Sequence, residues 1–357
     1  MSSSHLTRFH KWLLQSPPIE WFDLRLRDLM IGALSQGPIP QHIAMVMDGN
    51  RRYARQKRIE VAEGHNRGFE ALAQMLEVCY RCGVKVLTVY AFSVENFKRS
   101  RYEVDTLMSL MKSKLTQLSE HGELFERYGA SVRVLGQREL VAPDVLEAID
   151  RAVDLTKNNT DAILNICFPY ASRNEITIAI RDTVNDWSQP IRERERTFSQ
   201  SHIESHIRLR NISNDASKKQ DQYSPAPSAI SDTEDSIAES TLPVTPADYT
   251  ELTTLKPSLT YPDPESIDAN TLSEHMFITS NPPVDLFIRT SGVERFSDFL
   301  LWQAHEKTDI KFVDCMWPDF DLWQLIPILV EWQWKRRKAA ADERVARRGM
   351  RLPKKSD

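Results

Sequence analysis

One short segment combines a carboxylate, a glycine and two arginines directly after an apolar run. Asp48, Gly49, Asn50, Arg51 and Arg52 follow the apolar residues 43–47. A carboxylate oxygen is a ligand that Mg²⁺ prefers, and a guanidinium binds phosphate oxygens in pairs. The apolar run predicts a buried strand, and open α/β sheets bind ligands at the carboxyl ends of their strands. The segment therefore indicates a site for a metal-bridged anion such as a diphosphate. The alternative is an ordinary strand-to-helix turn with solvated arginines.

Three further apolar segments end in arginines, hydroxyls or amides. Residues 85–91, 162–168 and 284–288 lead into 92–99 (Phe-Ser-Val-Glu-Asn-Phe-Lys-Arg), 170–173 (Tyr-Ala-Ser-Arg) and 289–299 (Arg-Thr-Ser-Gly-Val-Glu-Arg-Phe-Ser-Asp-Phe). In a parallel sheet these ends share one edge, where they would gather more cations than one diphosphate needs. We therefore expect two phosphorylated ligands. His65, after Gly64 at a predicted helix start, could donate to a phosphate, although a lone histidine is more often structural.

The elements that must position these residues alternate along the chain. Periodicity predicts helices over 64–81, 102–121, 143–158, 172–187 and 319–335, and strands over 85–92, 131–135, 162–168, 284–288 and 311–313. Gly83 should end the first of these helices, and Ser172 should cap the fourth. The alternation predicts an α/β fold, a single domain with a mostly parallel central sheet flanked by helices.

The composition shifts divide the chain into four parts. Residues 1–40 form an amphipathic helical segment that suits a membrane surface or packing on the domain. The domain itself would span 41–188 and 265–338. Residues 189–264, rich in Ser, Thr, Pro and acidic side chains, cannot bury enough apolar surface and predict a largely disordered insertion. Residues 339–357 are expected to be a basic tail.

Composition excludes several classes of protein. The net charge of −4 over 357 residues favours no nucleic acid partner. No apolar run reaches the length of a membrane span, and there is no nucleotide P-loop, nucleophile elbow or secretory signal. Cys79 and Cys82 form a C-x-x-C, but a second pair is missing, so we interpret them as core thiols.

Taken in order, six motifs resemble those of the cis-prenyltransferases, the undecaprenyl and dehydrodolichyl diphosphate synthases. They are residues 42–54, 63–65, 92–97, 289–292, 297–303 and 317–320. The likeness runs from about His42 to Trp334, broken only by the insertion. The amphipathic start and the insertion are more similar to the eukaryotic, dolichol-making branch.

The resemblance implies Mg²⁺-dependent condensation of isopentenyl diphosphate onto farnesyl diphosphate with cis double bonds. Asp48 would bind Mg²⁺ and help the allylic diphosphate leave, and Ser93 and Asn96 would assist proton removal or orient the substrates. The other implied substrate-binding residues fall into three groups. Gly49, Asn50, Arg51, Arg52, His65 and Arg99 would hold the primer's diphosphate, Phe92 and Phe97 would shape an apolar pocket, and Arg289, Arg295 and Ser297 would bind isopentenyl diphosphate.

Four positions depart from the family pattern or extend it. Val61 stands where many relatives carry a phosphate-binding arginine, which puts that contact in doubt. Asp309 stands where bacterial relatives place a metal-binding glutamate, so a metal role is expected for it. Arg347 and Gly349 resemble an R-x-G element that reaches across the dimer. If they do that job a homodimer suffices, and otherwise a sister regulatory subunit is needed in a heterodimer.

The resemblance also implies peripheral attachment to the cytosolic face of the endoplasmic reticulum membrane and a role in dolichol synthesis for protein glycosylation. The alternative is a non-catalytic subunit or scaffold of a prenyltransferase complex. Retention of Asp48 and the arginine set argues against that alternative, because a scaffold has no use for a phosphate-binding set.

We predict that deletion of residues 189–264 leaves catalysis nearly intact, because such a segment adds little to a packed core. Steady-state prenyl transfer by the purified deletion variant measures this. A loss of more than about tenfold would contradict the expectation.

Overall fold

The computed structural model describes residues 17–120, 123–190, 260–305 and 307–350. The chain forms two compact units, 1–183 with 268–357 and 184–267. Most of the predicted insertion, residues 191–259, lies outside the described residues. Within the second unit, the indole N–H of Trp187 donates to the carbonyl oxygen of Asp263 at 3.2 Å and to Ser266 Oγ at 3.1 Å, beside the 3₁₀ helix η3 (Pro264–Ser266).

The first unit is built on a six-stranded sheet in the order β3-β4-β2-β1-β5-β6. Every neighbouring pair is parallel, which confirms the predicted sheet. The strands are β1 His42–Val46, β2 Val86–Tyr90, β3 Ala130–Leu135, β4 Ala162–Cys167, β5 Leu286–Arg289 and β6 Asp309–Phe312. β1 and β2 are buried along their whole length, as expected for central strands with both faces covered.

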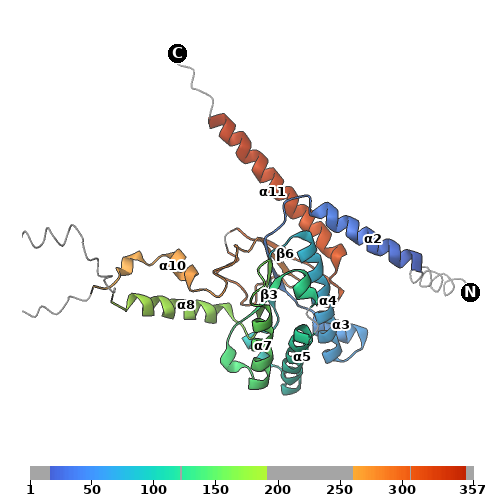
Figure 1. Ribbon diagram of the computed structural model, residues 1–357, viewed down its shortest axis with the longest axis horizontal. Helices are drawn as coiled ribbons and strands as arrows, with labels where there is room; N and C mark the ends of the chain where they lie inside the picture. Colours follow the sequence, from blue (N-terminus) through green and yellow to red (C-terminus); the bar gives the residue numbers. More distant parts are fainter. Residues whose placement is uncertain (1–16, 121–122, 191–259, 306, 351–357) are drawn as a thin grey trace, which may run out of the picture. The chain divides into compact units, whose positions relative to one another are not determined.

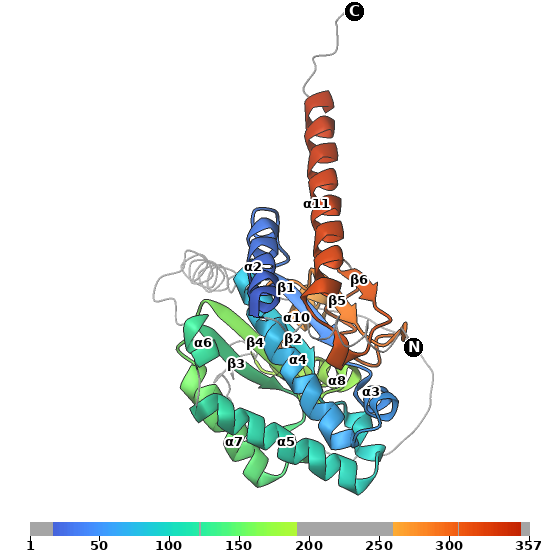
Figure 2. The same ribbon diagram turned by 90° about the vertical axis from the view of Figure 1, so that its right-hand side faces the viewer.

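Helices connect the strands (Figure 1). The α-helices are α2 Pro17–Leu34, α3 Asn50–Lys57, α4 Val61–Cys82, α5 Arg101–Glu120, α6 Glu123–Arg127, α7 Pro143–Thr156, α8 Ser172–Trp187, α10 Ala269–Glu274 and α11 Leu322–Met350. Further 3₁₀ turns are η1 Val94–Lys98, η2 Arg138–Leu140 and η4 Trp317–Asp319. Figure 2 shows α4, α5 and α7 lying across the sheet.

Strand alternation divides the core into two layers. Ile43 and Met45 of β1 belong to the larger apolar cluster with α4, α5 and α7, whereas Ala44 and Val46 belong to a smaller cluster on the other face with Phe287. Successive side chains of a strand point to opposite faces, so one apolar run supplies both layers.

Several element predictions are confirmed and others need correction. Gly83 ends α4 with a φ of 98°, as predicted. Ser172 was predicted to cap its own helix, but the hydrogen bond that its Oγ accepts comes from the amide of Leu301 at 3.0 Å.

The helix predicted over 319–335 ends later in the structure, because α11 continues to Met350 and includes residues 339–350 of the predicted basic tail. The alanines and charged residues that follow Trp334 are good helix formers, and no glycine or proline interrupts them before Gly349.

The predicted core thiols and the amphipathic start both have a defined place. Cys79 and Cys82 are free and buried, and burial raises the pKa of both thiols. In α2, Ile31 and Leu34 are buried while Leu29 is exposed. The carboxyl-terminal turn of α2 therefore packs on the domain. No helix within the described residues is long and apolar enough to cross a membrane.

A buried polar row crosses the sheet at His42. Its Nδ1 donates to the carbonyl oxygen of Pro282 at 2.8 Å, and its Nε2 lies 2.7 Å from Thr88 Oγ1, which also accepts from Asn165 Nδ2. A carbonyl only accepts, so the proton is on Nδ1 and Nε2 accepts from the threonine. Burial lowers the pKa of His42 from 6.5 to about 4.

We predict that this histidine makes the fold acid-sensitive. The pKa of His42 is lower in the folded protein than in the unfolded chain. Its contribution to the free energy of unfolding is therefore fully present above pH 6.5 and is lost as the pH falls toward 4. Between pH 7.5 and pH 5 the loss is about 2 kcal/mol in the free energy of unfolding. Urea denaturation at the two pH values measures it.

A matched pair of variants isolates the effect. His42→Asn should flatten this pH dependence, whereas His305→Asn, at an exposed histidine, should leave it unchanged. Equal slopes for wild type and His42→Asn would refute the assignment.

Candidate functional site

Asp48 stands at a tight turn between β1 and α3. Gly49 makes the turn with a φ of 111°, and its amide donates to Asp48 Oδ1 at 2.7 Å. A Cβ at Gly49 would lie 3.1 Å from both Met316 and Ser291, so the turn is also closely surrounded. Only glycine meets both conditions without strain.

Asp48 is held by two arginines from different parts of the chain. Its Oδ2 accepts from Arg289 Nη2 at 2.9 Å and lies 3.7 Å from Arg52 Nη2. Burial opposes ionisation of the carboxyl, but the hydrogen bond and charge of Arg289 outweigh it, and the pKa of Asp48 lies below its usual value. Asp48 is therefore a carboxylate at neutral pH.

Arg289 is the most deeply placed of these cations. Its side chain is 3% exposed, and its Nη1 donates to Ser297 Oγ at 2.6 Å and to the carbonyl oxygen of Arg295 at 2.5 Å. Arg295 Nε donates to the same Ser297 Oγ at 3.1 Å. Arg52 donates to the carbonyl oxygen of Ser291 at 3.0 Å and contacts its hydroxyl. We refer to Asp48, Arg52, Arg289, Arg295 and Ser297 as the Asp48 cluster.

A second charged group forms where α4 and α5 begin. Glu103 Oε1 accepts from Arg99 Nη1 at 2.9 Å and lies 3.6 Å from His65 Nε2, while Glu103 Oε2 lies 3.7 Å from Arg51 Nη1. Burial lowers the pKa of His65, Arg99 lowers it further, and Glu103 opposes both. We refer to Arg51, His65, Arg99 and Glu103 as the Glu103 cluster.

The segment after β5 has a strained backbone. Ser291, Ser297, Asp298 and Leu300 all have positive φ, between 48° and 77°. Asp298 clasps this segment to α8, because its carboxylate accepts from the amide and Nε of Arg173 at 2.9 and 3.0 Å. Strained conformations persist where the surroundings determine them, and they often mark binding sites.

An apolar cavity of about 110 Å³ lies between the sheet and helices α4 and α5. Its polar lining residues include Lys114, Asn50 and His65; His65 belongs to the Glu103 cluster, and Asn50 lies between Asp48 and Arg51 in the chain, so we call the part at Asn50 and His65 its polar end. Phe92 lines it and packs edge-to-face on Phe97 with ring centres 5.0 Å apart. The other lining residues include Leu72, Leu76, Leu107, Met111, Leu115, Leu164, Ile166 and Phe168. An anionic group at the polar end could thus extend an apolar chain into the cavity.

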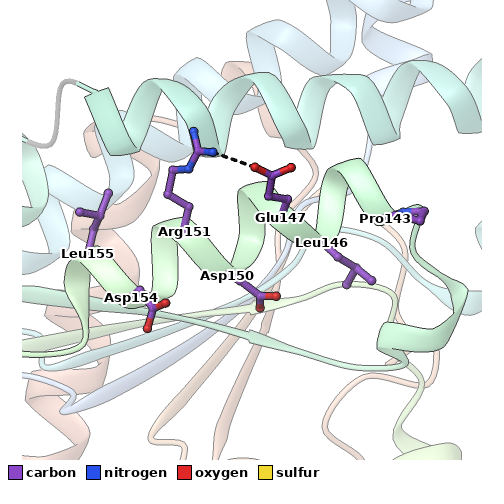
Figure 3. Close-up of a pocket in the computed structure, with 7 residues that line it drawn as sticks. All are labelled: Pro143, Leu146, Glu147, Asp150, Arg151, Asp154 and Leu155. Atoms are coloured by element: carbon purple, nitrogen blue, oxygen red, sulfur yellow. Dashed lines mark hydrogen bonds and ion pairs between the residues drawn. The ribbon is translucent and has the colours of Figure 1, made fainter.

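A second hollow, on the outer face of α7, differs in charge. Glu147, Asp150 and Asp154 line it, and Arg151 is paired with Glu147 at 2.9 Å (Figure 3). An acidic, solvent-facing surface of this kind repels phosphates. This hollow is therefore a poor candidate for an anion site.

The predicted gathering of four strand ends is confirmed. Residues after β1, β2, β4 and β5 contact one another there: the amide of Val94 donates to the carbonyl oxygen of Tyr170, and the amide of Ser172 to that of Asp298. Ser93 Oγ accepts from the amide of Glu95 at the start of η1, and Asn96 Oδ1 accepts from Arg99 Nη2 at 2.9 Å. Ser93 and Asn96 thus lie at the same edge.

The structure places Asp309, for which the resemblance predicts a metal role, away from Asp48. Asp309 is the first residue of β6 and pairs with Leu286, the first residue of β5, so it lies at the amino edge of the sheet. Its Oδ1 accepts from Lys335 Nζ at 2.9 Å. Asp48 lies at the opposite edge, because Leu286 pairs with Ile43 and Asp48 follows Ile43 by five residues, beyond the end of β1.

Three other positions singled out in the sequence, Val61, Arg347 and Gly349, form no contact with either cluster among the interactions of the described residues. Val61 is an exposed residue at the start of α4. Arg347, near the end of α11, is exposed and lies 3.9 Å from Glu343, and Gly349 belongs to the same helix. The structure of one chain does not bring this pair to the Asp48 cluster.

Sequence reasoning missed residues that complete the site. Glu103 follows Arg99 by four residues at the start of a predicted helix, a spacing that could have indicated the ion pair. Trp317 donates from its backbone to the carbonyl oxygen of Asp48 and from Nε1 to that of Gly68, linking β1 to α4. No local signal predicts that role.

Comparison with known proteins decides the family. A family model described as "Putative undecaprenyl diphosphate synthase" matches residues 46–222 and 227–340. The chain belongs to the cis-prenyltransferase family. A dehydrodolichyl diphosphate synthase complex subunit of Schizosaccharomyces pombe is 39% identical over 90% of this chain and 96% of its own length. A dehydrodolichyl diphosphate synthase of Solanum lycopersicum is 32% identical over 86% and 89%.

A solved structure supports the fold of this cis-prenyltransferase. Lavandulyl diphosphate synthase from Lavandula x intermedia, in complex with dimethylallyl diphosphate, superposes with a TM-score of 0.59 at 22% identity, covering 83% of this chain and 95% of that one. The family assignment and the sheet predicted from sequence are thus confirmed, and the protein is a prenyl-transferring enzyme by family.

We predict that Gly49→Ala destabilises this cis-prenyltransferase by roughly 3 kcal/mol, from a strained φ and close contacts together. Gly83→Ala is the matched control, because Gly83 has a similar φ of 98° but no heavy atom within 4 Å of an added Cβ. It should cost only about 1–2 kcal/mol. Chemical denaturation of both variants measures the difference, and equal losses would show that the contacts around Gly49 do not matter.

Proposed function

We propose that this chain is the catalytic component of a dehydrodolichyl-type synthase. It would condense isopentenyl diphosphate onto farnesyl diphosphate to make a long polyprenyl diphosphate for dolichol synthesis and protein glycosylation. The observation that carries the proposal is the ionised Asp48 between Arg52 and Arg289, beside the polar end of an apolar cavity. The arrangement suits a ligand with an anionic head and an apolar tail.

Arg51, His65 and Arg99 of the Glu103 cluster, together with the start of α3, would bind the primer's diphosphate. Arg51, His65 and Arg99 point their polar atoms to one place, and the residues Gly49 and Asn50 begin a helix whose amides also attract anions. When the allylic C–O bond breaks, negative charge grows on the leaving diphosphate. Donors already in position stabilise that charge without reorganising.

Three members of the Asp48 cluster, Arg289, Arg295 and Ser297, would hold the second diphosphate, that of isopentenyl diphosphate. Arg289 and Arg295 both donate toward Ser297, so their cationic groups converge on one hydroxyl. Asn96 orients Arg99 through its Oδ1, which fits a role in aligning the two substrates. Ser93 lies beside it, and one of the two would pass on the proton lost when the new double bond forms.

The residues present fit Mg²⁺. Within the described residues no group of three or more metal-ligating side chains exists. Mg²⁺ is commonly bound by one or two carboxylates together with substrate phosphates, so Asp48 would hold it jointly with a diphosphate. The ion would supply charge neutralisation of the leaving group.

A non-catalytic scaffold explains these features less well. A scaffold gains nothing from Arg289, a guanidinium that is almost fully buried. Burying such a charge costs free energy unless a carboxylate and further acceptors satisfy it. Retaining it is easier to understand if a substrate uses it.

A partner subunit is also part of the proposal, since the yeast relative is named as a complex subunit. The edge strand β6 exposes Ile310 and Phe312, and α11 exposes Val330 and Trp334. An edge strand with apolar side chains favours pairing with another chain. That chain would be a sister subunit or a second copy, which Arg347 and Gly349 could reach.

The cellular location of the protein is part of the proposal, because the proposed product is a membrane lipid. We propose peripheral attachment at the cytosolic face of the endoplasmic reticulum membrane. Leu24 and Leu29 of α2 are exposed and could enter a lipid surface.

We predict that Asp48→Ala lowers the rate of incorporation of labelled isopentenyl diphosphate into lipid by about 10²–10³-fold. The assay uses farnesyl diphosphate, Mg²⁺ and the purified full chain, first alone and then with a co-purified partner. Activity that Asp48→Ala retains would contradict the proposed role, and a wild-type chain that stays silent even with its partner would favour the scaffold.

A further inference from the structure

Glu103 has a place that the proposed mechanism does not use. It lies in the first turn of α5, its side chain is 13% exposed, and it contacts three groups that each favour an anion. Arg99 is hydrogen-bonded to it at 2.9 Å, while His65 and Arg51 are 3.6 and 3.7 Å away. No other carboxylate of the described residues forms an ion pair with all three of these groups.

His65 and Arg51 lie too far from Glu103 to donate a hydrogen bond to it, so both can still donate to another anion. A separation of 3.6 Å is too long for a hydrogen bond, and His65 Nε2 is a buried atom with no hydrogen-bond partner among the described residues. Arg51 is also too far for a hydrogen bond and is half exposed. An anion with several oxygens could satisfy these donors better than one carboxylate does.

Asp48 and Glu103 thus divide the cations of the site between them. Asp48 pairs with Arg52 and Arg289, on the side where a metal ion would offset its charge. Among the described residues Glu103 forms ion pairs with Arg51, His65 and Arg99, and it competes directly with whatever anion those groups bind. Its charge is a cost to diphosphate binding.

We infer that Glu103 is a competing carboxylate that weakens binding of a diphosphate at Arg51, His65 and Arg99 and so speeds its release. The inference rests on the proposed function, in which inorganic pyrophosphate leaves this place after every condensation. A polymerising enzyme must empty the place once per added unit. When pyrophosphate leaves, the Glu103 carboxylate pairs again with Arg51, His65 and Arg99. This competition lowers the affinity of these groups for pyrophosphate while the groups keep their positions.

Glu103→Gln tests this, because an amide oxygen still accepts from Arg99 while the negative charge is removed. Calorimetry with inorganic pyrophosphate should show binding at least about tenfold tighter than wild type at low salt. The gain should shrink at about 1 M KCl, since the effect is electrostatic.

Asp105→Asn is the matched control. Asp105 is on the same helix, is exposed, and pairs with Arg101 at 3.8 Å, outside the cluster. It should change pyrophosphate affinity less than about twofold, which is the effect of net charge alone. A second variant, Glu103→Asp, keeps the charge but withdraws it by one methylene, and should bind pyrophosphate with intermediate affinity.

Pyrophosphate binding by Glu103→Gln that is equal to or weaker than wild type overturns the inference, and weaker binding assigns Glu103 to holding Arg99 in place. The binding arm needs no turnover, so it separates the two proposals. If the wild-type chain never elongates a prenyl chain, only the proposed function fails. If it does elongate, Glu103→Gln should slow steady-state turnover more than the first single turnover.

Discussion

The hydrogen-bonded pair of Arg289 and Asp48 connects the two halves of the site. Arg289 ends β5 and Asp48 follows β1, so the pair joins neighbouring strands at the carboxyl edge. A guanidinium that is 3% exposed needs acceptors, and it finds them in Asp48, Ser297 and the carbonyl oxygen of Arg295. These bonds fix the conformation of the segment after β5. Ser297, Asp298 and Leu300 hold positive φ there because the acceptors and the Asp298 clasp on Arg173 determine their positions.

Two carboxylates explain how a site rich in arginines stays folded. Like charges repel at short range, and the described part of the edge offsets them with carboxylates at two separate places. Asp48 serves the cations of β5 and α3, and Glu103 serves those of η1, α3 and α4. Each carboxylate holds its arginines in position, so that their guanidinium groups can also bind an incoming diphosphate.

The apolar cavity completes the chemistry, because it separates the two ends of a prenyl diphosphate. Asn50 and His65 form the end nearest the charged clusters, and the leucines of α4 and α5 line the rest. The cavity lies on the face of the sheet that carries Ile43 and Met45, opposite the smaller cluster around Phe287. A central strand that is apolar on both faces thus contributes to two apolar clusters, and the larger cluster borders this cavity.

Sequence alone determined the motifs, the family and the parallel sheet. The segment from Asp48 to Arg52 could be interpreted because residue type and strand-end position are local properties, and the parallel arrangement follows from alternating strands and helices. Tertiary structure decided which charges meet. The resemblance to bacterial relatives predicts a metal role for Asp309, but its register with Leu286 puts it at the amino edge, where Lys335 binds it.

The sequence did not predict a place for Glu103 in the site, although Glu103 lies only four residues from Arg99. Its other contacts, Arg51 and His65, come from α3 and α4. Strand register and helix packing are set by contacts between distant segments, and a motif records only its own residues.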